Sequence, residues 1–403
     1  MKPFSGFFQN LFFTSLLISL LLTGCDSDSS EVSDSYASDP VVSFTIRVST
    51  TRTSSRAGNN EDDNAGDPNW GNNPKPESGV SFESKVENIM AVLYEVDDSD
   101  RLITSDPVGH LVNPIYEYNS DGSLTISGRL QTKLTPGQLE DATNRFRMAI
   151  FVNSPDIDIS NPSASCFSLC GASGTSDFTS IPMYGVGAAN FSGLTRAIAS
   201  KETPFPIKDQ RGDASTLVIP ILRSMAQVRV KVDKNLFSSR KMRLQSISIS
   251  RHADKGFFVP YRWDELESLL SLGIEESMNG WNDSFSTGKQ ILPTVKDDDY
   301  ELNSQSMLRF YIPETYNTAA GDPDELKLTV NYTADDTEEE TPLSNTILFR
   351  QYDKNGHPTD SKPWNLVRNH IYEFIITGIN QKTGELEITV DASWWGEHQL
   401  DII

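Results

Sequence analysis

The chain has 403 residues and carries 56 acidic against 34 basic side chains, which gives a formal net charge of -22. A surface this acidic argues against binding to nucleic acid or to anionic lipid. Apolar residues make up 37% of the chain, which is sufficient for buried cores, and the length allows two ordinary domains once a targeting segment is removed. The composition indicates a soluble protein with a self-repelling, extracellular surface.

The first 24 residues resemble a signal peptide. Lys2 precedes an apolar run, LFFTSLLISLLL (11–22), which is about half as long as a bilayer-spanning helix. The run ends in Leu-Thr-Gly-Cys25, which resembles a bacterial lipobox, in which the cysteine thiol is acylated and cleavage makes that cysteine the new N-terminus. A plain signal peptide that ends in a cysteine is the alternative. The acidic stretch after Cys25 is expected to be a disordered tether, and it resembles the export tag of surface lipoproteins in Bacteroidetes.

Strand patterns dominate the remainder of the chain. The first strand alternates strictly between apolar and polar residues, so that one face presents Val42, Phe44, Ile46 and Val48. The same period recurs within 228–232, 326–332 and 386–392, with Asp-Gly and Asn-Gly turn signals at 121–122 and 355–356. This pattern predicts an all-β protein built from β-sandwiches.

Helical patterns are few. Residues 263–277 place several leucines on one face, and 134–146 form a shorter candidate; both are expected to cover a sheet or to connect strands. The apolar run at 215–233 is typical of two successive strands. We place a domain junction near residue 220, within about ten residues.

The first strand is followed by an exposed link. The segment TRTSSRAGNNEDD (51–63) has no apolar residue larger than alanine and contains Arg52 and Arg56, so a trypsin-like protease could cut it. An ordinary linker is the alternative. Burial of four apolar side chains contributes roughly 6 to 12 kcal/mol before ordering entropy is subtracted. If the strand left after a cut, the empty groove would accept a strand of another molecule, and repetition of this contact would build a filament.

Residues that could carry other chemistry are scattered. The histidines at 110, 252, 357, 370 and 398 show no metal-ligand spacing, and the sequence predicts no catalytic residue, no metal and no cofactor. His370 is expected to be structural. Cys166 and Cys170, in CFSLC, are interpreted as a local disulfide that pins a loop.

A group of aromatic residues supports a different function, the capture of glycans by stacking. Its members are Phe257, Phe258, Tyr261, Trp263, Trp394 and Trp395. However, Trp394 continues the apolar parity of the run at 386–392 and is therefore expected to be a core residue.

Several segments together resemble the fimbrillin family of Bacteroidetes, the FimA- and Mfa-type fimbrial subunits. They are the lipobox at Cys25, SRAG (55–58), VENIMAVLYEVDD (86–98), RFRMAIFVN (145–153), IPMYG (181–185), LVIPILRSMAQVRVKV (217–232), LRFYIPE (308–314), VRNHIYEFIITGI (367–379) and LEITVDASWW (386–395). RNHIY, followed by a strand and then by a strand that contains Trp, is the most telling of them.

The resemblance implies two tandem transthyretin-like β-sandwich domains with few short helices, no enzymatic activity, and a structural or adhesive role in a cell-surface fimbria. It divides the chain into a signal peptide (1–24), a tether and propeptide with a removable first strand (25–56), and two domains (57–220 and 221–403). Before maturation the protein would be an outer-membrane lipoprotein, held through a lipid on Cys25.

The family mechanism assigns further roles to residues of this chain. A trypsin-like protease would cut after Arg56, or alternatively after Arg52, and residues 41–52 would leave. The donor strand would lie at the C-terminus, with Leu400 and Ile402 as its apolar side chains, and the partners would be other copies of the chain and other fimbrial subunits. Since this tail is short, a fimbrial anchor or tip subunit is the alternative to the repeating stalk unit, and a glycan-binding surface lipoprotein is a further one.

Overall fold

The structure is a computed structural model. It describes residues 39–48, 85–167, 171–172, 180–200, 204–211, 216–233, 235–236, 242–250, 252–253, 255–260, 307–315, 317, 325–334, 343–360, 363–380, 385–394 and 401–402. Asp39–Ile403 form one compact unit. Among the described residues, no helix combines the length and the apolar character that crossing a membrane would require.

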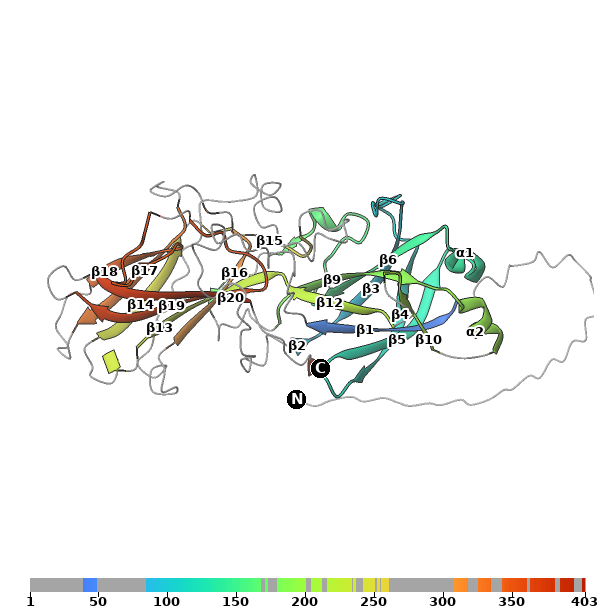
Figure 1. Cartoon of the computed structure of the whole chain (residues 1–403), viewed down its shortest axis with the longest axis horizontal. Helices are drawn as coiled ribbons and strands as arrows, with labels where there is room; N and C mark the ends of the chain where they lie inside the picture. The colour runs from blue at the N-terminus through green and yellow to red at the C-terminus, as the bar shows by residue number, and fades with distance from the viewer. Residues whose placement is uncertain are drawn as a thin grey trace, which may run out of the picture. The chain divides into compact units, whose positions relative to one another are not determined.

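The described N-terminal elements are strands with two short α-helices and one 3-10 helix (Figure 1). In chain order they are β1 (Val41–Val48), β2 (Lys85–Val86), β3 (Ile89–Val96), β4 (Gly109–Tyr118), β5 (Leu124–Thr132), α1 (Pro136–Glu140), β6 (Arg145–Val152), η3 (Pro162–Ala164), β7 (Cys166–Phe167), β8 (Gly171–Ala172), β9 (Met183–Asn190), α2 (Leu194–Ser200), β10 (Phe205–Pro206), β11 (Lys208–Asp209) and β12 (Val218–Arg223).

The described C-terminal elements with defined bounds are strands, and residues 235–236 are helical. The strands are β13 (Met225–Val232), β14 (Met242–Ser250), β15 (Gly256–Phe257), β16 (Met307–Pro313), β17 (Lys327–Ala334), β18 (Leu343–Leu348), β19 (His370–Ile379), β20 (Leu386–Trp394) and β21 (Asp401–Ile402). The described part of the chain is therefore mostly β, as the alternating pattern predicts.

The N-terminal strands close into a ring. Their hydrogen-bonded order is β1-β12-β9-β6-β3-β4-β5, and β5 pairs again with β1, which makes a seven-stranded barrel. The two transthyretin-like sandwiches stay a prediction, and this part of the structure is a closed barrel. The physical reason is that β1 pairs along both of its edges, and so joins strands that would otherwise border an opening.

The C-terminal strands form two separate sheets around a second core. One sheet has the order β20-β19-β13-β16-β8 and the other has the order β14-β17-β18. Buried side chains from both sheets, such as Val228, Phe374 and Val330, belong to one cluster. Two sheets that share a core are the arrangement expected of a sandwich.

The boundary between the two main cores lies within one continuous apolar run of the sequence. Ile221 on β12 is the last residue of the first core, and Ala226 on β13 begins the second. The domain junction predicted near residue 220 stays a prediction, and this change of core lies beside it.

The excursion between β6 and β9 connects the two cores. Its strand β7 pairs with β15, and its strand β8 extends the larger C-terminal sheet beside β16. The rings of Phe167 and Phe258 are 5.3 Å apart between centroids. Gly256 is required at this crossing, because a Cβ on it would lie 2.2 Å from the Phe167 ring.

The predicted helix at 134–146 is shorter in the structure. It comprises only α1, and Thr135 caps its N-terminus in a reciprocal arrangement with Gln138. Residues from Arg145 onward belong to β6, which is buried along almost its whole length between β3 and β9. The candidate helix at 263–277 lies outside the described residues.

We expect Gly185→Ala to destabilise the barrel by about 2 to 3 kcal/mol. An added Cβ would lie 2.3 Å from the carbonyl oxygen of Pro220, where β9 packs on β12, so the backbone would have to shift. Gly137→Ala in α1 is the control, since its Cβ would meet nothing within 4 Å. Urea unfolding of the two variants measures the effect. Equal unfolding midpoints for Gly185→Ala and Gly137→Ala would contradict the packing described.

Candidate functional site

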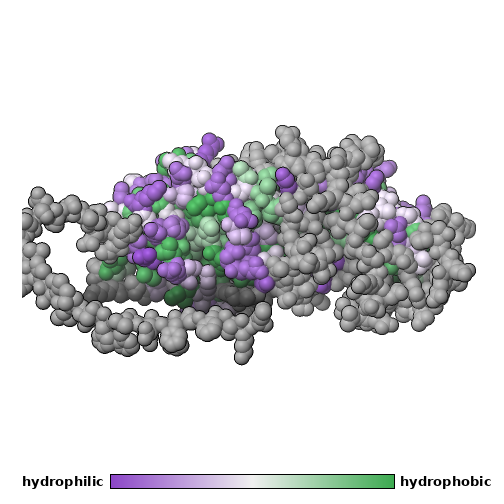
Figure 2. Space-filling model, turned by 180° about the vertical axis from the view of Figure 1, so that it is seen from behind, coloured by the Kyte–Doolittle hydropathy of each residue, from purple (hydrophilic) through white to green (hydrophobic). Residues whose placement is uncertain are grey.

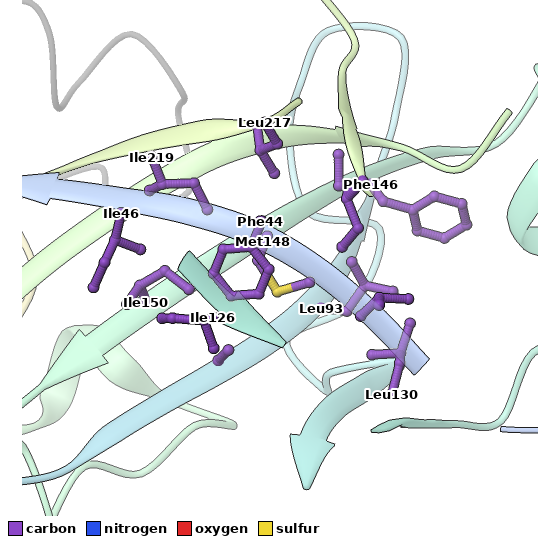
Figure 3. Packing of buried hydrophobic residues seen from close by; sticks show 14 of the residues in the cluster. Phe44, Ile46, Leu93, Ile126, Leu130, Phe146, Met148, Ile150, Leu217 and Ile219 are labelled. Atoms are coloured by element: carbon purple, nitrogen blue, oxygen red, sulfur yellow. The ribbon is translucent and has the colours of Figure 1, made fainter. Parts of the chain in front are cut away.

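The strand β1 is the structural centre of the candidate site. Val42, Phe44 and Ile46 are each 0% exposed and belong to the first core. Figure 3 shows Phe44 and Ile46 directed into a cluster that includes Ile126, Met148 and Ile219. The alternation seen in the sequence therefore corresponds to a buried inner face, as predicted, although the side chain of Val48 lies outside the described residues.

Both edges of β1 are hydrogen-bonded. On one edge it runs antiparallel to β5, with Phe44 opposite Ile126, and on the other it runs parallel to β10 and β12, with Ile46 beside Ile219. Individual backbone bonds outside the regular ladders tie the strand further. Leu130 N donates to Pro40 O (2.9 Å), Thr45 N to Leu217 O (2.9 Å) and Ile207 N to Ser43 O (2.8 Å).

The outer face of β1 is short and polar. The hydroxyls of Thr45 and Thr125 are 3.4 Å apart between their oxygens, and Ser43 is 8% exposed. Near the C-terminal end of β1, Arg47 forms an ion pair with the carboxylate of Asp121 in the β4–β5 turn. The hydroxyl and then the backbone N–H of Ser123, followed by Arg47, hold the pKa of Asp121 below its usual value, so this carboxylate is ionised at neutral pH.

The β4–β5 turn that carries Asp121 follows its predicted chemistry. Gly122 has a φ of 80°, a left-handed conformation that glycine adopts without strain. Its N–H donates to Asn119 O at 3.1 Å, and Asn119 N donates to Ser123 O at 2.9 Å. The turn therefore fixes Asp121 near the C-terminal end of β1.

The residues predicted to process the protein lie outside the described residues. They are Cys25, Arg52 and Arg56. Lipidation at Cys25 and cleavage at either arginine stay predictions. What the structure adds is that β1 ends at Val48 and the next described residue is Lys85, so the whole connection between β1 and the body runs through residues 49–84.

The predicted donor tail is only partly described. Leu400 lies outside the described residues, as does the side chain of Ile402. The backbone of β21, Asp401–Ile402, pairs in parallel with β2, Lys85–Val86. Val86 is 2% exposed and belongs to the first core, so the end of the chain pairs with a strand that is packed into the barrel of the same molecule.

The predicted disulfide cannot be assigned from the described residues. Cys166 is exposed and its thiol is free in the structure, while Cys170 lies outside the described residues. The bridge stays a prediction. The loop that it would pin is the excursion that carries β7 and β8 to the C-terminal sheets.

The RNHIY segment has a structural role that sequence reasoning did not find. The guanidinium of Arg368 is buried and donates to the carbonyl oxygens of Phe257, Phe258 and Val259 at 3.1 to 3.2 Å. It also contacts the Glu314 carboxylate at 2.6 Å. An arginine at the start of a strand was the only signal in the sequence, and it does not identify three carbonyl acceptors that lie more than a hundred residues away.

Beside Arg368, the histidine of the motif is also buried. His370 is 0% exposed, and its Nδ1 lies 2.8 Å from the carbonyl oxygen of Arg368. His252 is likewise 0% exposed. Within the described part of the chain, no three His, Cys, Asp or Glu side chains gather where a metal ion could bind.

The aromatic group proposed for glycan stacking does not form an exposed platform from its described members. Phe258 is 4% exposed and packs with Tyr94 and Phe151 against the outer side of β3 and β6. Tyr261, Trp263 and Trp395 lie outside the described residues, as does the side chain of Trp394.

Apolar side chains on the surface do not single out another site. The exposed ones include Ile103, Ile115 and Tyr118, which are 55, 69 and 44% exposed. On the face seen in Figure 2, hydrophobic residues lie between hydrophilic ones over the coloured part of the chain. Isolated apolar residues of this kind are usual on protein surfaces.

No protein-family model and no curated protein matches the sequence. Among solved structures, the chain is similar to the tip fimbrial protein Mfa3 from Porphyromonas gingivalis with a C-terminal truncation, at 10% identity and a TM-score of 0.47, over 88% of this chain and 99% of that one. It is also similar to a fimbrial assembly protein from Parabacteroides distasonis, at 8% identity and a TM-score of 0.38, over 87% and 98% of the two chains.

A third similar structure is a candidate cell adhesion protein, also from Parabacteroides distasonis, at 14% identity and a TM-score of 0.44, over 89% of this chain and 98% of that one. At such identities and TM-scores these structures establish no function for this chain.

We expect Phe44→Ala to lower the free energy of unfolding by about 3 to 5 kcal/mol, because it removes a fully buried ring and leaves a cavity inside the barrel. Thr45→Ala is the matched control on the outer face of the same strand and should cost less than about 1 kcal/mol. Urea unfolding of the lipid-free protein compares the two. Similar losses would show that β1 does not contribute to the core as described.

Proposed function

We propose that this chain is a structural subunit of a cell-surface fimbria, in which a strand from a neighbouring subunit replaces β1 after proteolysis at Arg56 or Arg52. The observation that carries the proposal is the position of β1. It is hydrogen-bonded on both edges and buries Val42, Phe44 and Ile46, yet it is the first described strand of the chain.

A first strand can leave without unthreading the fold. Its only covalent connection to the body runs through residues 49–84, so one cut in that link separates β1 from the barrel. The link contains two arginines in a polar setting. Most central strands are held at both ends by the chain, and a single cut does not free them.

The groove left by β1 would require a replacement strand. Three fully buried side chains contribute about 5 to 9 kcal/mol of gross burial. In addition, the backbone groups of β5 on one side and of β12 on the other would lose their partners, which is costly unless they are hydrated or paired again. A strand from another subunit supplies both the apolar side chains and the backbone partners.

The remaining features of the proposal come from the sequence. A lipid on Cys25 would hold the precursor at the outer membrane, facing outward, until cleavage transfers the body to a fimbrium. The two cores are proposed to be the two transthyretin-like domains of the family, with the closed N-terminal barrel as the form that includes β1. A role in adhesion follows from the fimbrial location.

An anchor or tip subunit is the second candidate. The observation that favours it is the pairing of the C-terminal strand β21 with β2 of the same chain, because a tail that is engaged in this way is not offered to a neighbour. An anchor would keep β1 and its lipid, so mass spectrometry of the protein from intact cells would find acylated Cys25 attached to the body. A cleaved subunit would begin at Ala57 or at Thr53.

Limited trypsin treatment of the lipid-free precursor tests the proposal. We expect a cut in the 51–57 segment, after which β1 exchanges with an added, labelled peptide of residues 39–50, as read by native mass spectrometry. An Arg52→Gln/Arg56→Gln variant should stay uncut there and should not exchange β1. If the cut wild-type protein does not exchange β1, the proposed function is wrong.

A reversible lock on β1 provides an independent test. The close approach of the Thr45 and Thr125 hydroxyls suits a disulfide between Thr45→Cys and Thr125→Cys. The oxidised double variant should retain β1 after cleavage and should not exchange it for an added peptide of residues 39–50, and reduction should restore exchange. Each single variant is a control for the native cysteines, and exchange in the oxidised, cleaved double variant would contradict strand replacement.

A further inference from the structure

We propose that the strand that replaces β1 runs in the same direction as β1, carries an aromatic side chain at the position of Phe44, and belongs to a different protein and not to the C-terminal tail of another copy. This inference rests on the proposed function and narrows its partner.

The direction follows from the two edges of the groove. The β5 edge pairs with Val41–Ile46 in antiparallel register, and the edge formed by β10 and β12 pairs with Val42–Ser43 and Thr45–Val48 in parallel register. The hydrogen-bonding groups of both edges are therefore spaced for a strand that runs as β1 does. A reversed strand would exchange the parallel and antiparallel patterns and would displace the hydrogen-bond partners along both edges.

The C-terminal end of β1 adds a second argument for direction. Asp121 is fixed by the β4–β5 turn and pairs with Arg47, the residue that follows the last described inward side chain, Ile46. A strand in the β1 direction can place a basic residue there. In a reversed strand, the residue facing Asp121 would instead precede the first inward-facing side chain of that strand.

The preference for an aromatic side chain follows from the centre of the inner face. Phe44 is among the largest fully buried side chains of the described residues, and it lies between Val42 and Ile46 on the strand. Figure 3 shows its ring within the cluster near Met148 and Ile126. A smaller side chain at this position would leave a cavity, because a close-packed core relaxes only partly.

The outer position beside Phe44 limits the incoming strand further. Ser43 is only 8% exposed although it lies on the opposite face from Phe44. It stands opposite Ser127 on β5 and beside Pro206 on β10. A small residue is therefore required before the aromatic one, which gives the pattern apolar, small, aromatic, polar, apolar.

The C-terminal tail does not match this pattern. After Trp394 the chain reads WGEHQLDII, and one parity holds His398, Leu400 and Ile402 while the other holds Glu397, Gln399 and Asp401. Neither parity places an aromatic apolar residue between two aliphatic ones. In addition, the backbone of Asp401–Ile402 already pairs with β2 in the same molecule.

Peptide exchange on the full, lipid-free chain tests the inference. The chain is first cut within residues 51–57, which leaves β1 bound in the barrel. A labelled peptide with the sequence 39–50 is then exchanged for β1, and unlabelled competitor peptides are added to displace it. The competitors are the same peptide unlabelled, its Phe44→Ala and Val42→Ala forms, and a tail peptide of residues 394–403. Binding is read from fluorescence anisotropy and from native mass spectrometry.

We expect the Phe44→Ala peptide to bind at least about 100-fold more weakly than the parent and the Val42→Ala peptide about tenfold more weakly. The tail peptide should be at least about 100-fold weaker than the parent. A tail peptide within tenfold of the parent would overturn the assignment to a different protein. A loss below tenfold for Phe44→Ala would overturn the aromatic preference.

Direction is tested with a peptide whose side chains read the same both ways apart from one cysteine, Thr-Val-Thr-Phe-Cys-Val-Thr. With its ring in the Phe44 pocket, this cysteine lies opposite residue 125 if the peptide runs as β1 does, and opposite residue 127 if it is reversed. We expect crosslinking to Thr125→Cys at least tenfold faster than to Ser127→Cys. The opposite preference, or equal rates, would overturn the direction.

The outcomes separate this inference from the proposed function. If the unlabelled 39–50 peptide itself does not exchange into the cut protein, the groove does not accept strands and the proposed function fails. If it exchanges but the aromatic, direction or tail result is contrary, only the inference fails.

Discussion

The structure depends on the pairing of β1 along both of its edges. Through β5 on one side and β10 and β12 on the other, this strand closes the N-terminal barrel. A closed barrel has no free edge and buries the inner face of every strand, which stabilises it against association with other strands. The same closure makes the first strand the one element whose departure would open a groove that runs along its full length.

A replaceable strand must be tightly held and yet separable. The fully buried side chains of Val42, Phe44 and Ile46 and the Arg47–Asp121 ion pair stabilise β1 in the barrel. Its separability comes from chain topology alone, because no other strand has to move for β1 to leave. Burial makes the empty groove unfavourable, so under the proposed function the free energy that holds β1 in the barrel would also favour binding of the replacing strand.

The junction between the two cores is built from longer-range contacts. β12 leads through Ser224 into β13, the excursion with β7 and β8 pairs with C-terminal strands, and Arg368 holds the carbonyls of Phe257, Phe258 and Val259. A buried arginine that donates to several carbonyls and contacts Glu314 is satisfied only in one arrangement of these segments. Such contacts join the segments of the two cores beyond the β12–β13 connection itself.

The sequence by itself determined the all-β class, the inner face of β1, the turn at Asp121-Gly122 and the strands within 228–232, 326–332 and 386–392, because each depends on alternation or turn chemistry within a few residues. The sequence did not determine that the helix predicted at 134–146 would be limited to α1. The residues that follow belong to β6, and its pairing with β3 and β9 depends on strands that are distant in the sequence.

Only the tertiary structure decided that β1 runs parallel to β12 and antiparallel to β5, that this closes a barrel, and that the chain's last described strand pairs with β2. The reason is that local patterns specify which side chains are buried, whereas the choice of neighbours and their direction depends on contacts between residues that are far apart in the chain.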